Sequence, residues 1–125
     1  MKIQPQRPTC GKILSHSKHQ VSAFRESLGV SLCVFKIGVT AAPRVRFQDY
    51  LTKNYTCMWL IHVDNDLGII HMLEAALISE FNVCTGCRNA PGTGGEGALN
   101  RKTHQGPPYF IYMCGGRADQ MKRLG

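Results

Sequence analysis

The feature that most restricts the fold is a short segment, residues 30–40, in which an apolar run stops at a glycine and a threonine. Residues 30–37 are rich in β-branched and aromatic side chains, which favour a strand. Thr40 then stands near the expected cap of a helix, and Pro43 falls in its first turn. The segment therefore predicts a strand that passes directly into a helix at residues 44–51.

Further elements follow in the second half of the chain. Residues 57–63 predict a second strand, and the Asp-Asn-Asp sequence at 64–66 predicts a turn that also caps the next helix. Apolar residues recur at helical spacing over residues 67–81, which indicates the best-defined helix of the chain. Residues 109–114 alternate aromatic and aliphatic side chains and predict another strand.

Glycines and charge give the expected ends of these elements. Gly115 and Gly116 are expected to end the last strand, and residues 117–124 predict a short basic helix. The fold class that results is α/β in the α+β sense: a small antiparallel sheet of three or four strands flanked by helices.

The N-terminal part has no clear hydrophobic period. Residues 1–20 are therefore expected to form a basic, partly flexible arm, followed by a short strand at residues 21–25 and a turn at residues 26–29. A chain of 125 residues suits one domain, so residues 21–125 are predicted to form it.

The charge of the chain favours a polyanionic partner. The formal net charge is +7 and the sequence pI is about 9.3, which favours binding to DNA because neutralised phosphates release counterions. The chain has no apolar run near the roughly 20 residues of a membrane span, and its start lacks the apolar centre of a secretory signal. We therefore expect no membrane partner and an intracellular protein of the cytoplasm or nucleus, with organelle import left open.

Six cysteines without a secretory signal indicate a reducing compartment rather than a disulfide scaffold. Cys84 and Cys87 could supply half of a structural Zn²⁺ site. The sequence has no second Cys-x-x-Cys at a diagnostic spacing, so free thiols are favoured over zinc.

Polar residues stand where they suit phosphate chemistry. Arg44 and Arg46 follow the first predicted strand, and Glu74 interrupts the apolar helix. Asn89 opens a glycine-rich segment, residues 89–97. A guanidinium can bind a phosphate through two hydrogen bonds, and one carboxylate can hold a divalent metal. Side chains two positions apart on a helix point in nearly opposite directions, so only one of the two arginines can face a common site.

At these residues the chain resembles the GIY-YIG endonuclease superfamily, whose second motif is a strand ending in Tyr-Ile-Gly. Lys36-Ile37-Gly38 is similar to that motif. Arg46 follows the glycine by about eight residues, which is the distance of the family's catalytic arginine. Tyr50 lies one helical turn later, where family members commonly carry a histidine or a tyrosine.

The later residues extend the resemblance, which covers roughly residues 21–97. Glu74 is similar to the family's metal-binding glutamate, and Asn89 follows it by about fifteen residues, as a family asparagine often does. The resemblance implies a DNA endonuclease that hydrolyses phosphodiester bonds with one Mg²⁺ or Mn²⁺ ion and no small-molecule cofactor. Glu74 would hold the metal, and Arg46 would stabilise the charge on the phosphate. We expect such a domain to act as a monomer.

Five residues complete the expected site. Arg44 and Asn89 are phosphate-binding candidates, and Gly38 and Thr40 are expected to form the structural turn after the strand. His71 stands one turn before Glu74 on the same helix face and is a candidate auxiliary ligand or base.

Departures from the family motifs leave the base open. Lys36 replaces the second signature tyrosine, and the best match to the first motif, residues 22–24, has neither its glycine nor its tyrosine. Phe24 has no hydroxyl and cannot orient or deprotonate water. Lys36 and Tyr50 are therefore the candidate bases. The alternative function is a catalytically inactive DNA-binding or interaction module on the same fold, which would retain Arg46.

Overall fold

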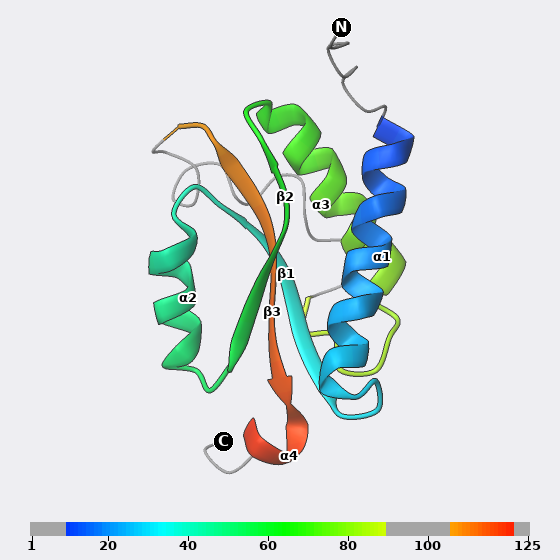
Figure 1. Ribbon diagram of the computed structural model, residues 1–125, viewed down its shortest axis with the longest axis vertical. Helices are drawn as coiled ribbons and strands as arrows, with labels where there is room; N and C mark the ends of the chain where they lie inside the picture. The colour runs from blue at the N-terminus through cyan, green and yellow to red at the C-terminus, as the bar shows by residue number, and fades with distance from the viewer. Residues whose placement is uncertain (1–9, 90–105, 122–125) are drawn as a thin grey trace, which may run out of the picture.

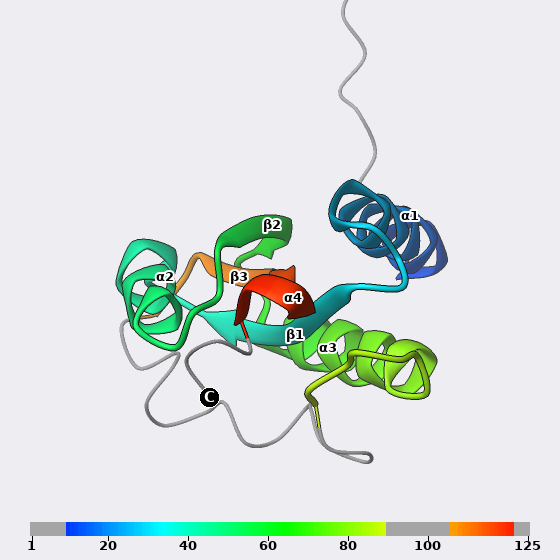
Figure 2. The same ribbon diagram turned by 90° about the horizontal axis from the view of Figure 1, so that it is seen from below.

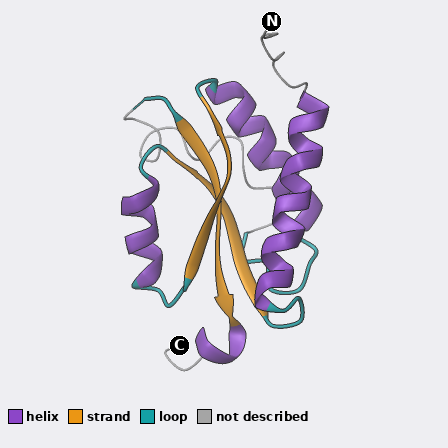
Figure 3. Ribbon diagram, viewed as in Figure 1, coloured by secondary structure: helices purple, strands orange, loops and turns teal. Residues whose placement is uncertain are grey.

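A single antiparallel sheet carries helices on both of its faces (Figures 1 and 3). The computed structural model describes residues 10–89 and 106–121. The expected fold class, an α+β domain built on a small antiparallel sheet, is confirmed, and the sheet has three strands. In chain order, the elements are α1 (Cys10–Leu28), β1 (Cys33–Thr40), α2 (Pro43–Leu51), β2 (Cys57–Asp64), α3 (Leu67–Phe81), β3 (Tyr109–Arg117) and α4 (Ala118–Met121).

The last strand occupies the centre of the sheet, whose order is β1-β3-β2. β3 is antiparallel to β1 without a register shift, from the pair Cys33 and Arg117 to the pair Thr40 and Phe110. It is also antiparallel to β2, where a shift between Leu60 and His62 marks a bulge. The two strands predicted from the first half of the chain are therefore neighbours only through the third.

The two faces of the sheet support different packing clusters, because successive side chains of a strand point to opposite faces. On one face, Ile37 and Val39 of β1 belong to the larger core, which also takes in residues of α1 and α3. On the other face, Tyr112 and Cys114 of β3 form a smaller cluster with Tyr50 of α2. Figure 2 shows this division, with α2 on one side of the sheet and α1 and α3 on the other.

The N-terminal helix α1 corrects the sequence prediction for this region. Residues 10–28 form one helix, so the strand predicted at 21–25 and the turn predicted at 26–29 are wrong, and the flexible arm does not include residues 10–20. Residues 1–9 lie outside the described part. The buried residues of α1 are spaced at three and four positions, as helical packing requires: Ile13, Ser17, Val21 and Phe24. The sequence does not show this buried face as an apolar pattern, because one of its four residues is a serine.

The middle of the chain folds as predicted. The helix expected at residues 44–51 corresponds to α2, the strand at 57–63 to β2, and the helix at 67–81 to α3. Asp66 caps α3 and accepts hydrogen bonds from the backbone N–H groups of Gly68 and Ile69. Within residues 10–89 and 106–121, no helix combines the length and hydrophobicity needed to cross a membrane.

Two strands run past the glycines that were expected to end them. β1 continues through Gly38 to Thr40, and β3 continues through Gly115 and Gly116 to Arg117. A Cβ atom at Gly115 would lie only 2.7 Å from the ring of Phe24. These glycines therefore allow close packing within strands rather than ending them. The short helix predicted at residues 117–124 is present as α4, but Arg117 belongs to β3, and residues 122–124 lie outside the described part.

The outer edge of β1 is covered by the chain that follows α3. The N–H of Phe35 donates to the carbonyl of Gly86 at 2.9 Å, and the N–H of Arg88 donates to the carbonyl of Phe35 at 2.8 Å. Residues 86–89 thus satisfy backbone groups that an edge strand would otherwise expose.

Replacing Phe24 tests whether α1 is part of the core. Phe24 has no exposed surface, and its ring packs edge-on against Trp59 with a centroid separation of 5.3 Å. We expect Phe24→Ala to lower the free energy of unfolding by about 3–5 kcal/mol, measured by urea denaturation. The matched control is Ser22→Ala on the exposed face of the same helix, with little expected effect. Equal stabilities of the two variants would contradict the packing described here.

Candidate functional site

A pair of buried tyrosine hydroxyls lies between α2 and β3. The Oη atoms of Tyr50 and Tyr112 are 2.9 Å apart, within hydrogen-bond distance. Tyr112 is fully buried and lies opposite Gly38 of β1 in the strand register. A Cβ atom at position 38 would overlap the phenol group of Tyr112, so only glycine leaves room for this ring. Gly38, the glycine of the predicted motif, therefore leaves space for the Tyr112 hydroxyl to pack against β1.

Burial keeps both hydroxyls protonated. It raises the pKa of Tyr50 to about 12, although the hydrogen bond from Tyr112 partly opposes the shift. The pKa of Tyr112 is raised further, mainly by burial and then by the neighbouring Tyr50. Near neutral pH the pair therefore acts through hydrogen bonding and not as phenolate bases.

Arg46 stands beside this pair, one turn before Tyr50 on α2. Its positive charge partly offsets the rise in pKa of both tyrosines, which indicates that the guanidinium is near their hydroxyls. Nη1 of Arg46 lies 3.5 Å from Oδ2 of Asp49, and about a quarter of the arginine side chain is exposed (24%). Such a partly exposed ion pair is weak and can be exchanged for a phosphate. Arg44 is exposed on the same helix.

Two residues of β1 border the same cluster. Lys36 lies opposite Cys114 in the register, so its side chain leaves the sheet on the face that carries Tyr112. Thr40 is buried, and its Oγ1 accepts the backbone N–H of Ala42 at 3.0 Å. Thr40 thus closes the turn by which β1 enters α2, which is the structural position expected for it.

The side chain of Asn89 forms hydrogen bonds with the backbone at the outer edge of β1. Its Oδ1 accepts the backbone N–H of Ile37 at 2.8 Å, and its Nδ2 donates to the carbonyl of Ile37 at 2.9 Å. Both ends of the amide are thereby engaged by the strand. Asn89 was expected to contact phosphate; in this structure it fixes the strand residue next to Gly38.

Glu74 enters from α3, on the opposite face of the sheet from Arg46. It is 5% exposed and takes part in a polar or electrostatic interaction. Its neighbours along the buried face of the helix, Ile70 and Leu77, are apolar. A carboxylate is rarely buried on such a face unless it is paired or binds an ion, and the interaction that Glu74 makes meets this condition. Its role as a metal ligand stays a prediction.

His71 carries a buried nitrogen one turn before Glu74. Its Nε2 has no hydrogen-bond partner in the described part of the structure, although most buried polar atoms have one. The sequence predicts His71 as an auxiliary metal ligand or base, and among the described residues its buried Nε2 lacks a hydrogen-bond partner.

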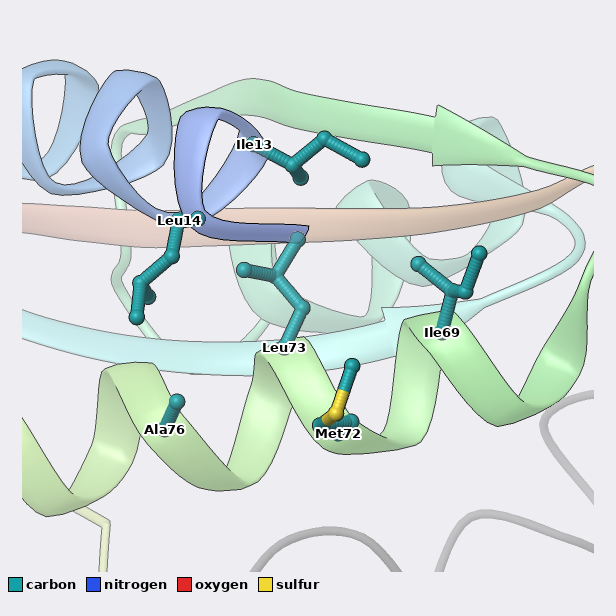
Figure 4. Close-up of a pocket in the computed structure, with 7 residues that line it drawn as sticks. Ile13, Leu14, Ile69, Met72, Leu73 and Ala76 are labelled. Atoms are coloured by element: carbon teal, nitrogen blue, oxygen red, sulfur yellow. The ribbon is translucent and has the colours of Figure 1, made fainter. Parts of the chain in front are cut away.

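A pocket of about 170 Å³ between α1 and α3 shows which side of α3 faces α1 (Figure 4). The α3 residues that line it are Ile69, Met72, Leu73 and Ala76. With 3.6 residues per turn, Glu74 and His71 lie on the side of α3 that faces away from α1. Glu74 also belongs to the buried face of α3, which packs against β1. Arg46 and Glu74 thus lie on opposite faces of the sheet.

The described residues fit a divalent metal only in a partial form. They contain no group of three His, Cys, Asp or Glu side chains placed to hold an ion. Mg²⁺ and Mn²⁺ can, however, be bound by one or two carboxylates together with water and substrate phosphate. Among the described residues of α3, the Glu74 carboxylate is a donor of that kind.

The cysteine pair is part of the chain that covers β1. The N–H of Cys87 donates to the carbonyl of Cys84 at 3.2 Å, which forms a tight turn. Burial raises the pKa of the Cys87 thiol, so it is not an activated thiolate.

Tyr112 is the site residue that sequence reasoning missed. The first family motif was sought upstream of β1, at residues 22–24, but these belong to α1. The strand that pairs with β1 comes instead from the C-terminal end and carries Tyr112. The available signal was the aromatic alternation of residues 109–114, which identified a strand but not its partner.

Comparisons with protein-family models, with curated proteins and with solved structures found no match to this chain.

Replacing Tyr50 tests the buried hydroxyl pair. Because the pKa of Tyr50 in the folded protein, about 12, exceeds the ordinary value of 10.0, its contribution to stability is complete below about pH 10 and is lost as pH rises toward 12. We expect Tyr50→Phe to make the decline in the free energy of unfolding between about pH 9 and about pH 11.5 less steep, measured by urea denaturation. The same decline in wild type and variant would contradict the buried position of this hydroxyl.

A second variant tests the structural role of Asn89. We expect Asn89→Ala to lower the free energy of unfolding by about 1–3 kcal/mol, because both polar backbone groups of Ile37 lose their partner. Asn65→Ala, in an exposed turn, serves as the control with little expected change. Loss of DNA binding at unchanged stability would instead identify Asn89 as a phosphate contact.

Proposed function

We propose that this domain is a divalent-metal-dependent DNA endonuclease that acts as a monomer, with its site at the edge of β1 beside Gly38. The observation that carries the proposal is the hydroxyl pair of Tyr50 and Tyr112, packed against Gly38 and next to Arg46. The superfamily that the chain resembles has a motif tyrosine upstream of its Tyr-Ile-Gly strand. Here β3 can provide the equivalent hydroxyl from the C-terminal side, so that the order of elements along the chain differs while a tyrosine remains next to the motif glycine.

DNA binding is supported by charge. The net charge of +7 provides a general attraction, and Arg44 lies exposed on the same helix as Arg46. The guanidinium of Arg46 forms an ion pair with the exposed carboxylate of Asp49. A phosphate can replace this carboxylate, because a guanidinium can donate two parallel hydrogen bonds to a phosphate. In this proposal Arg44 contributes to affinity and Arg46 binds the phosphate that is cleaved.

The residues near Gly38 have distinct roles in hydrolysis. Arg46 would stabilise the negative charge that develops on the phosphate oxygens. The neutral hydroxyls of Tyr50 and Tyr112 would hold a water molecule or a phosphate oxygen by hydrogen bonds, because burial keeps them protonated. The ammonium group of Lys36, which leaves the sheet on the same face, would add positive charge at the leaving oxygen.

Glu74 would hold the metal from the far side of the edge strand. A Mg²⁺ or Mn²⁺ ion held there would supply Lewis-acid stabilisation of the phosphate and lower the pKa of bound water. In this proposal, a phosphate lying across the edge of β1 would be contacted by Arg46 from one face of the sheet and by the ion at Glu74 from the other.

A second candidate is a DNA-binding module that does not cleave. The full burial of Tyr112 and the 5% exposure of Glu74 favour it, because both groups would need access to water for hydrolysis. This candidate keeps Arg46 and the basic charge and predicts salt-sensitive binding without product.

The test is cleavage of branched and linear plasmid DNA with Mg²⁺ or Mn²⁺. We expect Glu74→Gln and Arg46→Ala each to lower the single-turnover rate constant by about a hundredfold or more, as loss of a charge-stabilising group does. Glu80→Gln is the matched control on α3, because Glu80 is exposed and forms a surface ion pair with Lys18. Arg44→Ala is the control on α2, and it should weaken DNA affinity without a comparable loss of rate.

The other outcomes are equally informative. Binding by all proteins that weakens with salt, with no cleavage by any, would establish the non-cleaving module in place of the nuclease. Cleavage that survives in Glu74→Gln would exclude this glutamate as the metal ligand. Absence of both cleavage and binding would refute a function on DNA.

A further inference from the structure

We propose that His71 is a second protein ligand to the divalent ion, so that the metal is held by an imidazole and a carboxylate from adjacent turns of α3. The inference deepens the proposed function and rests on it for the presence of a metal at Glu74. It predicts which ion the site prefers, which the motif resemblance does not.

The spacing of the two residues suits joint coordination. Positions i and i+3 of a helix are neighbours on one face, with Cβ atoms roughly 5–6 Å apart. The Cα–Cβ bonds of a helix tilt toward its N-terminus, so the Glu74 side chain leans toward the turn that carries His71. In helical di-metal proteins, a glutamate and a histidine three residues apart on one helix bind metal together with glutamates of other helices; in α3 the order of the two residues is reversed.

The state of the His71 ring provides the second observation. Its Nε2 is buried and lacks a hydrogen-bond partner in the described residues, which is uncommon for a buried nitrogen. When Nδ1 carries the proton, Nε2 has a free lone pair, which is the form in which histidine binds metals. The buried carboxylate of Glu74 on the same face supplies the negative charge that makes the position favourable for a cation.

The remaining coordination positions agree with the placement of α3. His71 and Glu74 lie on the side of the helix that faces away from α1, whereas the apolar pocket in Figure 4 occupies the side toward α1. Two protein ligands leave the other positions of the ion to water and to a phosphate oxygen at the edge of β1.

The pair determines the expected metal preference. An imidazole suits transition metals, whereas Mg²⁺ prefers oxygen ligands alone. We therefore expect Mn²⁺ to bind more tightly than Mg²⁺ in the absence of DNA. Mn²⁺ is also the appropriate probe because cysteine sulfur ligands, such as Cys84 and Cys87 could supply, favour softer ions.

The experiment is a titration of the full chain with Mn²⁺ alone, followed by electron paramagnetic resonance. In the wild type we expect one bound ion whose pulsed spectrum contains a ¹⁴N coupling from imidazole. His71→Ala should remove that coupling and weaken Mn²⁺ binding at least tenfold, because even a residue that only supports a ligand contributes about 10–100-fold. His16→Ala, at an exposed position of α1, is the matched control and should change neither property.

Two further measurements separate this inference from the nuclease proposal. Glu74→Gln should abolish Mn²⁺ binding, and circular dichroism with urea denaturation of each variant identifies any loss of fold. Mn²⁺ that binds through Glu74 without a ¹⁴N coupling, and with unchanged affinity in His71→Ala, would overturn the role of His71 while leaving the nuclease intact. The expected coupling in a protein that cleaves no DNA would support the metal site and refute the nuclease. A folded protein that binds no Mn²⁺ would overturn the inference.

Discussion

Pairing of β3 with both β1 and β2 is the interaction on which the rest of the structure depends. β1 and β2 have no hydrogen bonds to each other, so without the last strand the two earlier strands would not form a sheet. The same strand contributes Ile111 and Met113 to one core cluster and Tyr112 and Cys114 to the other. Because these pairings join residues far apart in sequence, folding loses the entropy of closing long loops before the strand contacts form and compensate for that loss.

The candidate site is a direct consequence of this arrangement. Tyr112 reaches Tyr50 only because β3 lies beside β1 with Gly38 opposite the ring. The turn held by Thr40 then starts α2 at the end of β1 and brings Arg46 to the same place. A strand edge, a hydroxyl pair and a guanidinium are thus brought together by backbone register rather than by any local sequence motif.

In the proposed site, the position of β1 at the sheet edge lets residues from two faces serve one ligand. Residues 86–89 cover part of this edge, and Asn89 satisfies the backbone of Ile37 next to Gly38. Glu74 and His71 belong to α3 on one face of the sheet, and Arg46 belongs to α2 on the other. A central strand would have separated these groups completely, since its neighbours would block any passage between the faces. The proposed nuclease and the proposed metal pair both depend on this edge.

Local chemistry determined much of what sequence reasoning predicted. Asp66 specified the start of α3, apolar periodicity specified its length, and Pro43 with the preceding turn specified the start of α2. These features depend on neighbours within a few residues, so the sequence alone contains the necessary information. Arg46, Glu74 and His71 could be selected as candidates for the same reason, from their spacing on these helices.

Only the tertiary structure decided the features that depend on distant partners. Helix α1 was not predicted because Ser17, a polar residue, interrupts the apolar pattern of its buried face. Ser17 is buried because α1 packs against other elements. The glycines at positions 38 and 115 were interpreted as strand ends, whereas each makes room for a ring from another element. The role of Tyr112 was likewise hidden, because strand order is a long-range property that periodicity does not encode. The sequence by itself thus determined the local elements and the candidate charges, and long-range pairing decided which of them meet.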